Sequence, residues 1–235
     1  MGAATSNLIN APSKPSPKLP PPLEPGDRLS RQEFLLRYES MPEHIKAERI
    51  EGIVHMPPAA VSADFHGVPH GHLMGWLAVY RAMTPGTEIA DNSTIQLDLD
   101  NDPQPDASLF ILPSHGGRIK KDAKGYIIGS PEFVAETSGS SVSYDLGAKL
   151  EAYRRNGVRE YLVHRVYDGE IDWFILREGV YERLSPDDAG IIRCEAFPGL
   201  WLKASSFVSG NLADVLDILR RGAESEDHRA FVQSL

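Results

Sequence analysis

Two acidic residues beside apolar segments are the most chemically suggestive feature of the sequence. Asp106 follows Gln104-Pro105 and directly precedes the apolar run 107–112, and Glu136 ends the run Phe133-Val134-Ala135 thirty residues later. A carboxylate at the end of a buried strand is costly unless it is paired or holds a metal ion. Divalent cations such as Mg²⁺ bind carboxylate oxygens and keep positions for water and a phosphate. The two motifs therefore suggest a metal site for phosphoester chemistry.

A lysine on a following helix could lean over the same site. Lys149 lies four residues after Asp145, on or near the apolar face of that helix. Spacing alone also allows a simpler interpretation, in which Asp106 caps a turn and Glu136 pairs with an arginine. Lys149 would then form an ordinary surface pair with Asp145.

Three histidines, His66, His70 and His72, precede or begin a predicted helix. A His-x-His pair is common in metallohydrolases, but the fuller pattern needs an aspartate and another histidine close by, and residues 73–75 supply neither. A hydrogen-bonded histidine at the start of a helix is the favoured interpretation, and a contact from His66 or His70 to a phosphate is the functional alternative.

The elements that must position these residues alternate between helices and strands. Ser30 and Glu33 have the spacing of a helix N-cap with a capping-box acid, and Asp168-Gly169 is a strong hairpin signal. Strands are predicted at 47–56, 95–99, 107–112, 133–135, 160–166, 171–176 and 180–184. Helices are predicted after Ser30, over 69–83, over 145–157 and around 212–219. This order predicts a mixed α/β domain whose sheet combines parallel and antiparallel pairings.

The composition is that of an ordinary folded protein, with 41% hydrophobic and 24% charged residues among 235. These values exclude a disordered chain, a collagen and a coiled-coil rod. Residues 1–28 contain seven prolines and hardly any large apolar residue after Leu8. Such a segment cannot bury enough surface to offset its ordering entropy. We therefore expect a disordered proline-rich tail at 1–28 and one folded domain at 29–235.

Cysteine content and the N-terminal residues suggest where the protein works. Cys194 is the single cysteine, so no intramolecular disulfide can form, which fits a reducing cytoplasm. The first twelve residues carry no Lys or Arg, unlike a secretory signal. No apolar run approaches the roughly 18 residues of a membrane span. We expect a cytoplasmic protein that does not associate with membranes.

The charge is negative overall but unevenly distributed. The 24 Lys and Arg against 33 Asp and Glu give a net charge of −9, which argues against coating nucleic acid by bulk electrostatics. Residues 82–117 hold six acids and no Lys or Arg, whereas residues 118–165 hold nine basic and six acidic residues. The basic residues at 118–124 suit contact with a DNA backbone, with a solvated face as the ordinary alternative.

In combination, these motifs resemble the Uma-type restriction endonuclease family of the PD-(D/E)XK nuclease superfamily. The likeness rests on Pro105-Asp106-Ala107-Ser108-Leu109, Pro131-Glu132-Phe133-Val134-Ala135-Glu136 and the segment 140–161, and it extends from about Ser30 to near the C-terminus. It implies an α/β restriction-endonuclease-like core, a central mixed β-sheet flanked by helices. It also implies hydrolysis of phosphodiester bonds in DNA with Mg²⁺, or Mn²⁺ in its place. Cutting of two strands suggests a homodimer.

The resemblance also assigns roles to individual residues. Asp106 matches the aspartate of the PD motif and Glu136 the acid of the (D/E)XK motif, so both would be metal ligands. Ser138 stands where the superfamily has lysine. Lys149 matches a lysine that family members carry on the next helix, and its ammonium would orient the attacking water and offset phosphate charge.

Three further residues are expected near the site by the same resemblance. Glu48 and Glu51 match acidic positions of the family's first strand and would complete the site from the other side. His70 or His66 matches a histidine before the second helix and would touch a phosphate.

The stretch 137–141, Thr-Ser-Gly-Ser-Ser, resembles a subgroup of the family rather than its commoner form. Two alternative functions stay open at this point. One is a catalytically inactive nuclease-fold module that binds nucleic acid or protein. The other is a metal-dependent hydrolase of small phosphoesters.

Overall fold

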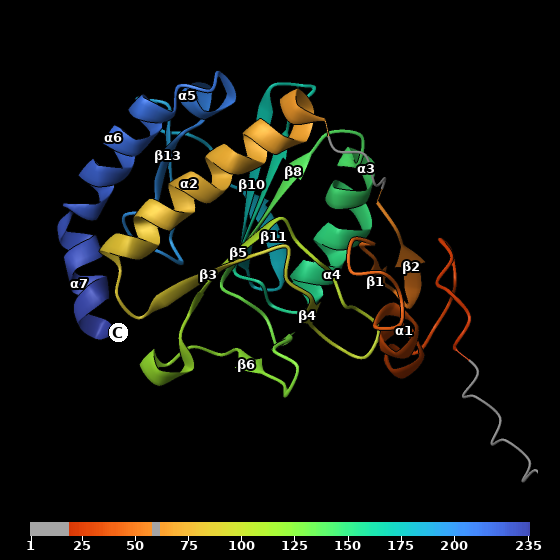
Figure 1. Ribbon diagram of the computed structural model, residues 1–235. Coiled ribbons are helices and arrows are strands. Elements are labelled where there is room, and N and C mark those ends of the chain that lie inside the picture. The colour runs from red at the N-terminus through yellow and green to blue at the C-terminus, as the bar shows by residue number, and fades with distance from the viewer. Residues whose placement is uncertain (1–18, 58–61) are drawn as a thin grey trace, which may run out of the picture.

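The computed structural model describes residues 19–57 and 62–235 (Figure 1). Most of the tail predicted at 1–28 therefore lies outside the described residues. Within residues 19–28, Leu23 is buried against Phe34, and Arg28 forms an isolated β-bridge with Ile53. The boundary at residue 29 stays a prediction.

A six-stranded mixed sheet forms the centre of the molecule (Figure 1). Its strands are β3 (Thr87–Asp91), β5 (Ala107–Ile111), β8 (Phe133–Ser138), β9 (Glu160–Arg165), β10 (Glu170–Arg177) and β11 (Val180–Arg183), in the order β11-β10-β9-β8-β5-β3. Only β8 and β9 run parallel; the other neighbours are antiparallel. The predicted α/β class with a central mixed sheet flanked by helices is confirmed.

Helices cover both faces of this sheet. The long helix α2 (Val68–Met83) packs on one face with α6 (Leu212–Ala223), and the helical stretch 142–155 packs on the other (Figure 1). Further elements beside α2 and α6 are α5 (Ala204–Val208), α7 (Glu226–Ser234), β12 (Ile191–Arg193) and β13 (Trp201–Lys203). No helix in the described ranges is long and apolar enough to span a bilayer.

The alternation of side chains along β8 divides the core in two. Phe133 and Ala135 join the cluster around Trp76 of α2, whereas Val134 joins Tyr153 on the opposite face. Successive residues of a strand point to opposite faces, so Glu136 lies on the Val134 face. The Glu136 carboxylate therefore points towards the helical stretch 142–155, which packs on this face of the sheet.

A smaller N-terminal unit lies against one end of the sheet (Figure 1). It contains α1 (Arg31–Tyr38), β1 (Glu48–Ile50) and β2 (Ile53–His55), and near it runs a three-stranded sheet of β4 (Ile95–Gln96), β6 (Lys120–Lys121) and β7 (Ile127–Ile128). The Ser30 hydroxyl accepts a hydrogen bond from the Glu33 backbone N–H, so the predicted N-cap of α1 is confirmed.

Arg49 of β1 joins this unit to the loop before β5. Its fully buried guanidinium pairs with Asp102 at 2.7 Å and donates to the carbonyls of Leu29 and Leu99. A buried pair is stabilising only when its remaining hydrogen-bonding groups are also satisfied, as they are here. Because Glu48 precedes Arg49 on the same strand, this anchor also fixes where the Glu48 carboxylate lies.

His164 of β9 makes stability depend on pH. Burial lowers the pKa of this imidazole to about 4, from 6.5, so the folded state favours the neutral ring. The unfolded chain gains a proton below pH 6.5 and the folded chain does not, so stability is lost as the pH falls from 6.5 towards 4. Relative to His164→Leu, the wild type should lose about 3 kcal/mol of unfolding free energy between pH 7 and pH 4.

Denaturant unfolding at the two pH values measures this difference. The exposed His115 offers a matched control, and His115→Leu should track the wild type at both pH values. A wild type and a His164→Leu variant that lose equal stability on acidification would contradict the assignment.

Candidate active site

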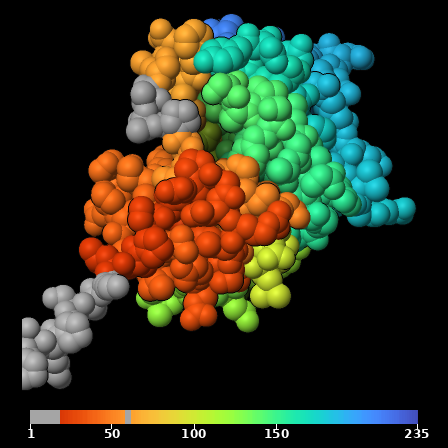
Figure 2. All heavy atoms as spheres, turned by 90° about the vertical axis from the view of Figure 1, so that its right-hand side faces the viewer, coloured from red at the N-terminus to blue at the C-terminus, as the bar shows by residue number. Residues whose placement is uncertain are grey.

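A cavity of about 600 Å³ opens between the β1–β2 hairpin, the end of β8 and the start of the helical stretch 142–155. In the space-filling view its mouth is the hollow between the N-terminal residues, red to orange, and the green segment that follows β8 (Figure 2). Four acidic residues and a lysine are among the residues that line it: Glu48, Asp106, Glu136, Asp145 and Lys149. They come from four separate stretches of sequence.

Strand pairing brings the two predicted metal ligands together. In the antiparallel β5–β8 register Ala107 faces Ala135, so Asp106 and Glu136 are the next residues along. The Asp106 backbone N–H donates to Glu136 Oε2 at 3.3 Å, and Thr137 N–H donates to Asp106 Oδ2 at 2.6 Å. The predicted proximity of the two motifs is thus a direct consequence of the pairing of two adjacent strands.

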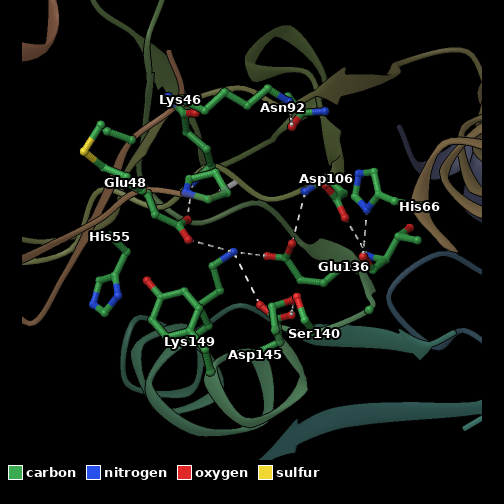
Figure 3. Close-up of a pocket in the computed structure, with 18 of the residues that line it drawn as sticks. Lys46, Glu48, His55, His66, Asn92, Asp106, Glu136, Ser140, Asp145 and Lys149 are labelled. Atoms are coloured by element: carbon green, nitrogen blue, oxygen red, sulfur yellow. Dashed lines mark hydrogen bonds and ion pairs between the residues drawn. The ribbon is translucent and has the colours of Figure 1, made fainter. Parts of the chain in front are cut away.

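Lys149 lies at the centre of the cavity's charged groups (Figure 3). Its ammonium is 2.9 Å from Glu136 Oε1, 3.2 Å from Glu48 Oε1 and 3.6 Å from Asp145 Oδ1. The pair with Asp145 exists, but it is buried rather than on the surface, and Glu136 pairs with this lysine instead of an arginine. The lysine therefore points into the site, as the resemblance implied.

A π-helical turn directs Lys149 inward. The stretch 142–155 consists of α3 (Val142–Tyr144), the π-turn η3 (Asp145–Lys149) and α4 (Leu150–Arg155). Ser138, on the same face of β8 as Glu136, donates to Asp145 Oδ2 at 2.7 Å. A lysine at position 138 would enter from the strand, whereas here a serine there holds Asp145 and Lys149 enters from the helix.

Burial strongly affects the charges of the central pair. Burial raises the pKa of Glu136 well above its usual range, although the Lys149 charge opposes this shift. Burial disfavours the Lys149 ammonium, but the carboxylates of Glu136, Glu48 and Asp145 outweigh it and raise the lysine's pKa. Its carboxylate neighbours therefore favour the protonated form of Lys149, and the Tyr153 hydroxyl also donates to Glu136 Oε1 at 3.1 Å.

Four carboxylates and two lysines line the cavity, which gives a formal charge of −2 from these groups. The carboxylates are Glu48, Asp106, Glu136 and Asp145, and the lysines are Lys46 and Lys149. This excess of carboxylate oxygen is the donor set that divalent cations bind, so the residues fit a metal ion.

Of the residues predicted from the acidic first strand, one reaches the cavity and one does not. Glu48 accepts a hydrogen bond from Gln104 N–H at 2.9 Å and faces Lys149. Glu51 sits in the turn between β1 and β2 with a φ of 55°, and its carboxylate pairs with Arg155 outside the cavity. The expectation that Glu51 completes the site is wrong, because the tight hairpin turns its side chain away.

The basic residues at 118–124 also lie apart from the cavity. None of them lines it; Arg118 pairs with Glu132 and Lys124 with Glu39. In Figure 1 their strand β6 lies at the opposite end of the molecule from α3. A contact between these residues and substrate held in the cavity is therefore not supported.

The two histidines before and within α2 stand beside Asp106. His66 lies on the π-turn η1 (Ala63–Gly67), and its Nε2 is 3.7 Å from Asp106 Oδ1. His70 follows one turn later, with its ring stacked on that of His66 at a centroid distance of 5.6 Å. Both rings are hydrogen-bonded, His66 to the Thr137 carbonyl and His70 to Asp91, in agreement with the favoured interpretation. Contact with a phosphate stays a prediction, and His72 is not part of this group.

Several residues of the site carried no recognisable signal in the sequence. Tyr153 and Gln104 act through hydrogen bonds that only the folded chain brings together. Phe65 and Tyr167 form an edge-to-face pair at the cavity rim, 4.9 Å between ring centroids, and both are largely exposed. Exposed aromatic residues beside a charged cavity could have been found only from the tertiary structure.

Comparison with known proteins agrees with this architecture. The model of the Uma2 family, described as "Putative restriction endonuclease", matches residues 31–205. Among solved structures, the crystal structure of a putative nuclease of the DUF820 family from Anabaena variabilis is similar at a TM-score of 0.52. The two chains are 15% identical, and the match covers 78% of this chain and 97% of that one, so it speaks for the fold alone. A search among curated proteins finds no significant match.

Proposed function

Because the chain belongs to the Uma2 family of putative restriction endonucleases, we propose that it is a nuclease that hydrolyses phosphodiester bonds in DNA with a divalent cation. The family and the fold support a nuclease-like function and a nucleic-acid substrate. DNA as the substrate, Mg²⁺ or Mn²⁺ as the ion, and a homodimer as the working form are finer parts of this proposal.

One observation carries the proposal: Asp106, Glu136 and Lys149 converge in one cavity. Glu136 is hydrogen-bonded both to the Asp106 backbone and to Lys149. Two acids and a lysine are the groups that metal-assisted phosphodiester cleavage needs, because charge develops on the phosphate as water attacks.

Each residue of the site has a different role in the proposed reaction. Asp106 and Glu136 would hold the cation, which when bound lowers the pKa of a water molecule and offsets phosphate charge. Lys149, kept protonated by its carboxylate neighbours, supplies a fixed positive charge beside the same phosphate. Thr137 N–H holds one Asp106 oxygen and so leaves the other directed at the site.

The rim of the cavity offers contacts for the rest of the nucleic acid. Lys46 is exposed and donates to Asn92, so its charge can reach a neighbouring phosphate. The exposed rings of Phe65 and Tyr167 present surfaces on which bases can stack. These groups favour a polymeric substrate over a small phosphoester.

Cleavage of supercoiled plasmid tests the proposal. The wild type with Mg²⁺ or Mn²⁺ should produce nicked and linear DNA, and excess chelator should stop the reaction. Asp106→Ala should reduce the rate at least about 10³-fold, since it removes a metal ligand and the fixed oxygen. Asp188→Ala, in the exposed turn before β12, is the matched control and should cut like the wild type. Equal nicking by wild type and Asp106→Ala would indicate a contaminant and contradict the proposal.

A further inference from the structure

His70 has a buried ring nitrogen without a hydrogen-bond partner. Its Nε2 lies 3.1 Å from Asp91 Oδ1, and because a carboxylate accepts, this nitrogen carries the proton. In the neutral ring Nδ1 is then an acceptor, and within the described residues nothing donates to it. Leaving a buried acceptor unsatisfied costs roughly 1–3 kcal/mol, so the arrangement needs an explanation beyond packing.

The ring of His66, which is stacked on that of His70, directs its unprotonated nitrogen towards Asp106. Its Nδ1 lies 3.1 Å from the Thr137 carbonyl, which can only accept, so Nδ1 carries the proton and Nε2 holds the lone pair. Nε2 is the atom that faces Asp106 Oδ1 at 3.7 Å. Two ligands of one ion, each about 2.1 Å from it, can stand up to about 4.2 Å apart. This separation therefore suits a shared cation.

The outer contacts of these ligands follow the pattern of metal sites. A metal-bound histidine usually donates its other N–H to a carboxylate or a backbone carbonyl. His70 uses Asp91 and His66 uses the Thr137 carbonyl in this way, while the Thr137 N–H holds the second oxygen of Asp106. One residue of β8, Thr137, thus orients two of the three ligands.

We propose that His66 Nε2, His70 Nδ1 and Asp106 Oδ1 bind a divalent transition-metal ion of the class that prefers imidazole, such as Zn²⁺ or Co²⁺. One ligand atom from each of these three residues lies within 4.8 Å of the other two, and a small rotation of a side chain would close the group around one ion. Three protein ligands leave a position for water or a phosphate oxygen, as in catalytic zinc sites.

The donor set selects among metals. Mg²⁺ and Ca²⁺ bind oxygen, whereas imidazole nitrogen favours Zn²⁺, Co²⁺, Ni²⁺ and related ions. Glu136 is not among the three ligands of this donor set, and its oxygens accept hydrogen bonds from Lys149, Tyr153 and the Asp106 backbone. The inference deepens the proposed function, on which it rests for the role of the ion, by placing an imidazole-preferring ion on the histidine side of Asp106.

Metal binding by the purified full chain tests the inference without any nucleic acid. The metal-free protein is titrated with Zn²⁺ by calorimetry and with Co²⁺ by visible absorption, which is intense for a four-coordinate ion with nitrogen ligands and weak for a hydrated one. The wild type should bind one equivalent with an intense cobalt spectrum. His70→Phe, which keeps a stacked ring, should weaken Zn²⁺ binding at least about 100-fold, and His72→Phe should leave it unchanged.

Asp91→Asn removes only the carboxylate behind His70 and should weaken Zn²⁺ binding about 10-fold without changing the melting temperature.

Equal Zn²⁺ affinity in the wild type and His70→Phe, or a weak cobalt spectrum typical of oxygen ligands, would overturn the inference. If the wild type cuts DNA with Mg²⁺ while failing these binding tests, the inference is wrong and the proposed function holds. If binding follows the predicted pattern but no DNA is cut, the metal site stands and the proposed function fails.

Discussion

Lys149→Met is expected to lower the rate of DNA cleavage about 10³-fold. The substitution removes the fixed cation beside the reacting phosphate, and one preorganised electrostatic group of this kind typically contributes that much. It also leaves Glu48, Glu136 and Asp145 without their shared partner, and loss of one member of a buried ion pair costs roughly 3–5 kcal/mol. Single-turnover cleavage of end-labelled DNA measures the first effect and thermal unfolding the second.

Two companion variants separate catalysis from folding. Lys149→Arg keeps a positive charge among the carboxylates, so it should unfold closer to the wild type, yet it should stay slow because a guanidinium does not reproduce the compact ammonium. Lys121→Met, the same change on the exposed strand β6, should leave the rate unchanged. Wild-type cleavage by Lys149→Arg and Lys149→Met alike would show that this lysine is not part of the chemistry.

Glu136→Gln is expected to reduce cleavage at least about 10³-fold while leaving the protein as stable as the wild type or more stable. The change keeps the shape of the side chain and removes a negative charge at the cation site, which is worth several kcal/mol in the transition state. Burial penalises a charge at this position and raises the pKa of Glu136, so the neutral amide of glutamine avoids that penalty in the folded protein. Lys149 retains Glu48 and Asp145 as partners.

Glu132, a buried glutamate directly before β8, provides the control for Glu136→Gln. Glu132 accepts a hydrogen bond from the Ile111 backbone and pairs with Arg118, outside the cavity. Glu132→Gln should therefore alter stability and leave the rate of cleavage near that of the wild type. A Glu136→Gln variant that cleaves as fast as Glu132→Gln would remove this carboxylate from the proposed mechanism.

Much of the fold could be predicted because its signals are local. The N-cap at Ser30, the Asp168-Gly169 hairpin and the apolar runs of β5 and β9 all have counterparts in the structure. Elements without a distinct local pattern were not predicted, among them β3, β12, β13, α5 and α7. Their place depends on packing against α2 and α6, which composition and spacing do not reveal.

The candidate site shows the same division. The β5–β8 register puts Asp106 next to Glu136, and this proximity follows from two neighbouring apolar strands. Helical spacing alone does not fix where the His66 and Lys149 side chains point, because both residues stand on π-turns, η1 and η3, that shift side chains relative to a regular α-helix. For Lys149 the resemblance to the family supplied the direction that spacing left open. Such turns are rare and frequently occur at functional sites.

Charge patterning was informative only in part. The acid-rich segment 82–117 does supply Asp106 and the Asp91 that supports His70. The basic residues at 118–124 suit contact with a DNA backbone by sequence, with a solvated face as the alternative. Of the nine basic residues at 118–165, only Lys149 lines the cavity, and Arg118 and Lys124 make ion pairs elsewhere. Sequence position alone could not tell which lysine the fold would bury.

Single-turnover cleavage of one end-labelled DNA duplex, with wild type and Glu136→Gln purified side by side, tests the central claim most directly. With the metal-loaded wild type in excess over DNA, the proposed function predicts discrete shorter strands that form in the absence of chelator and at least about 10³-fold more slowly with Glu136→Gln. Identical product from both proteins, or intact DNA with the wild type in the presence of Mg²⁺, Mn²⁺, Co²⁺ and Zn²⁺ in turn, would contradict it.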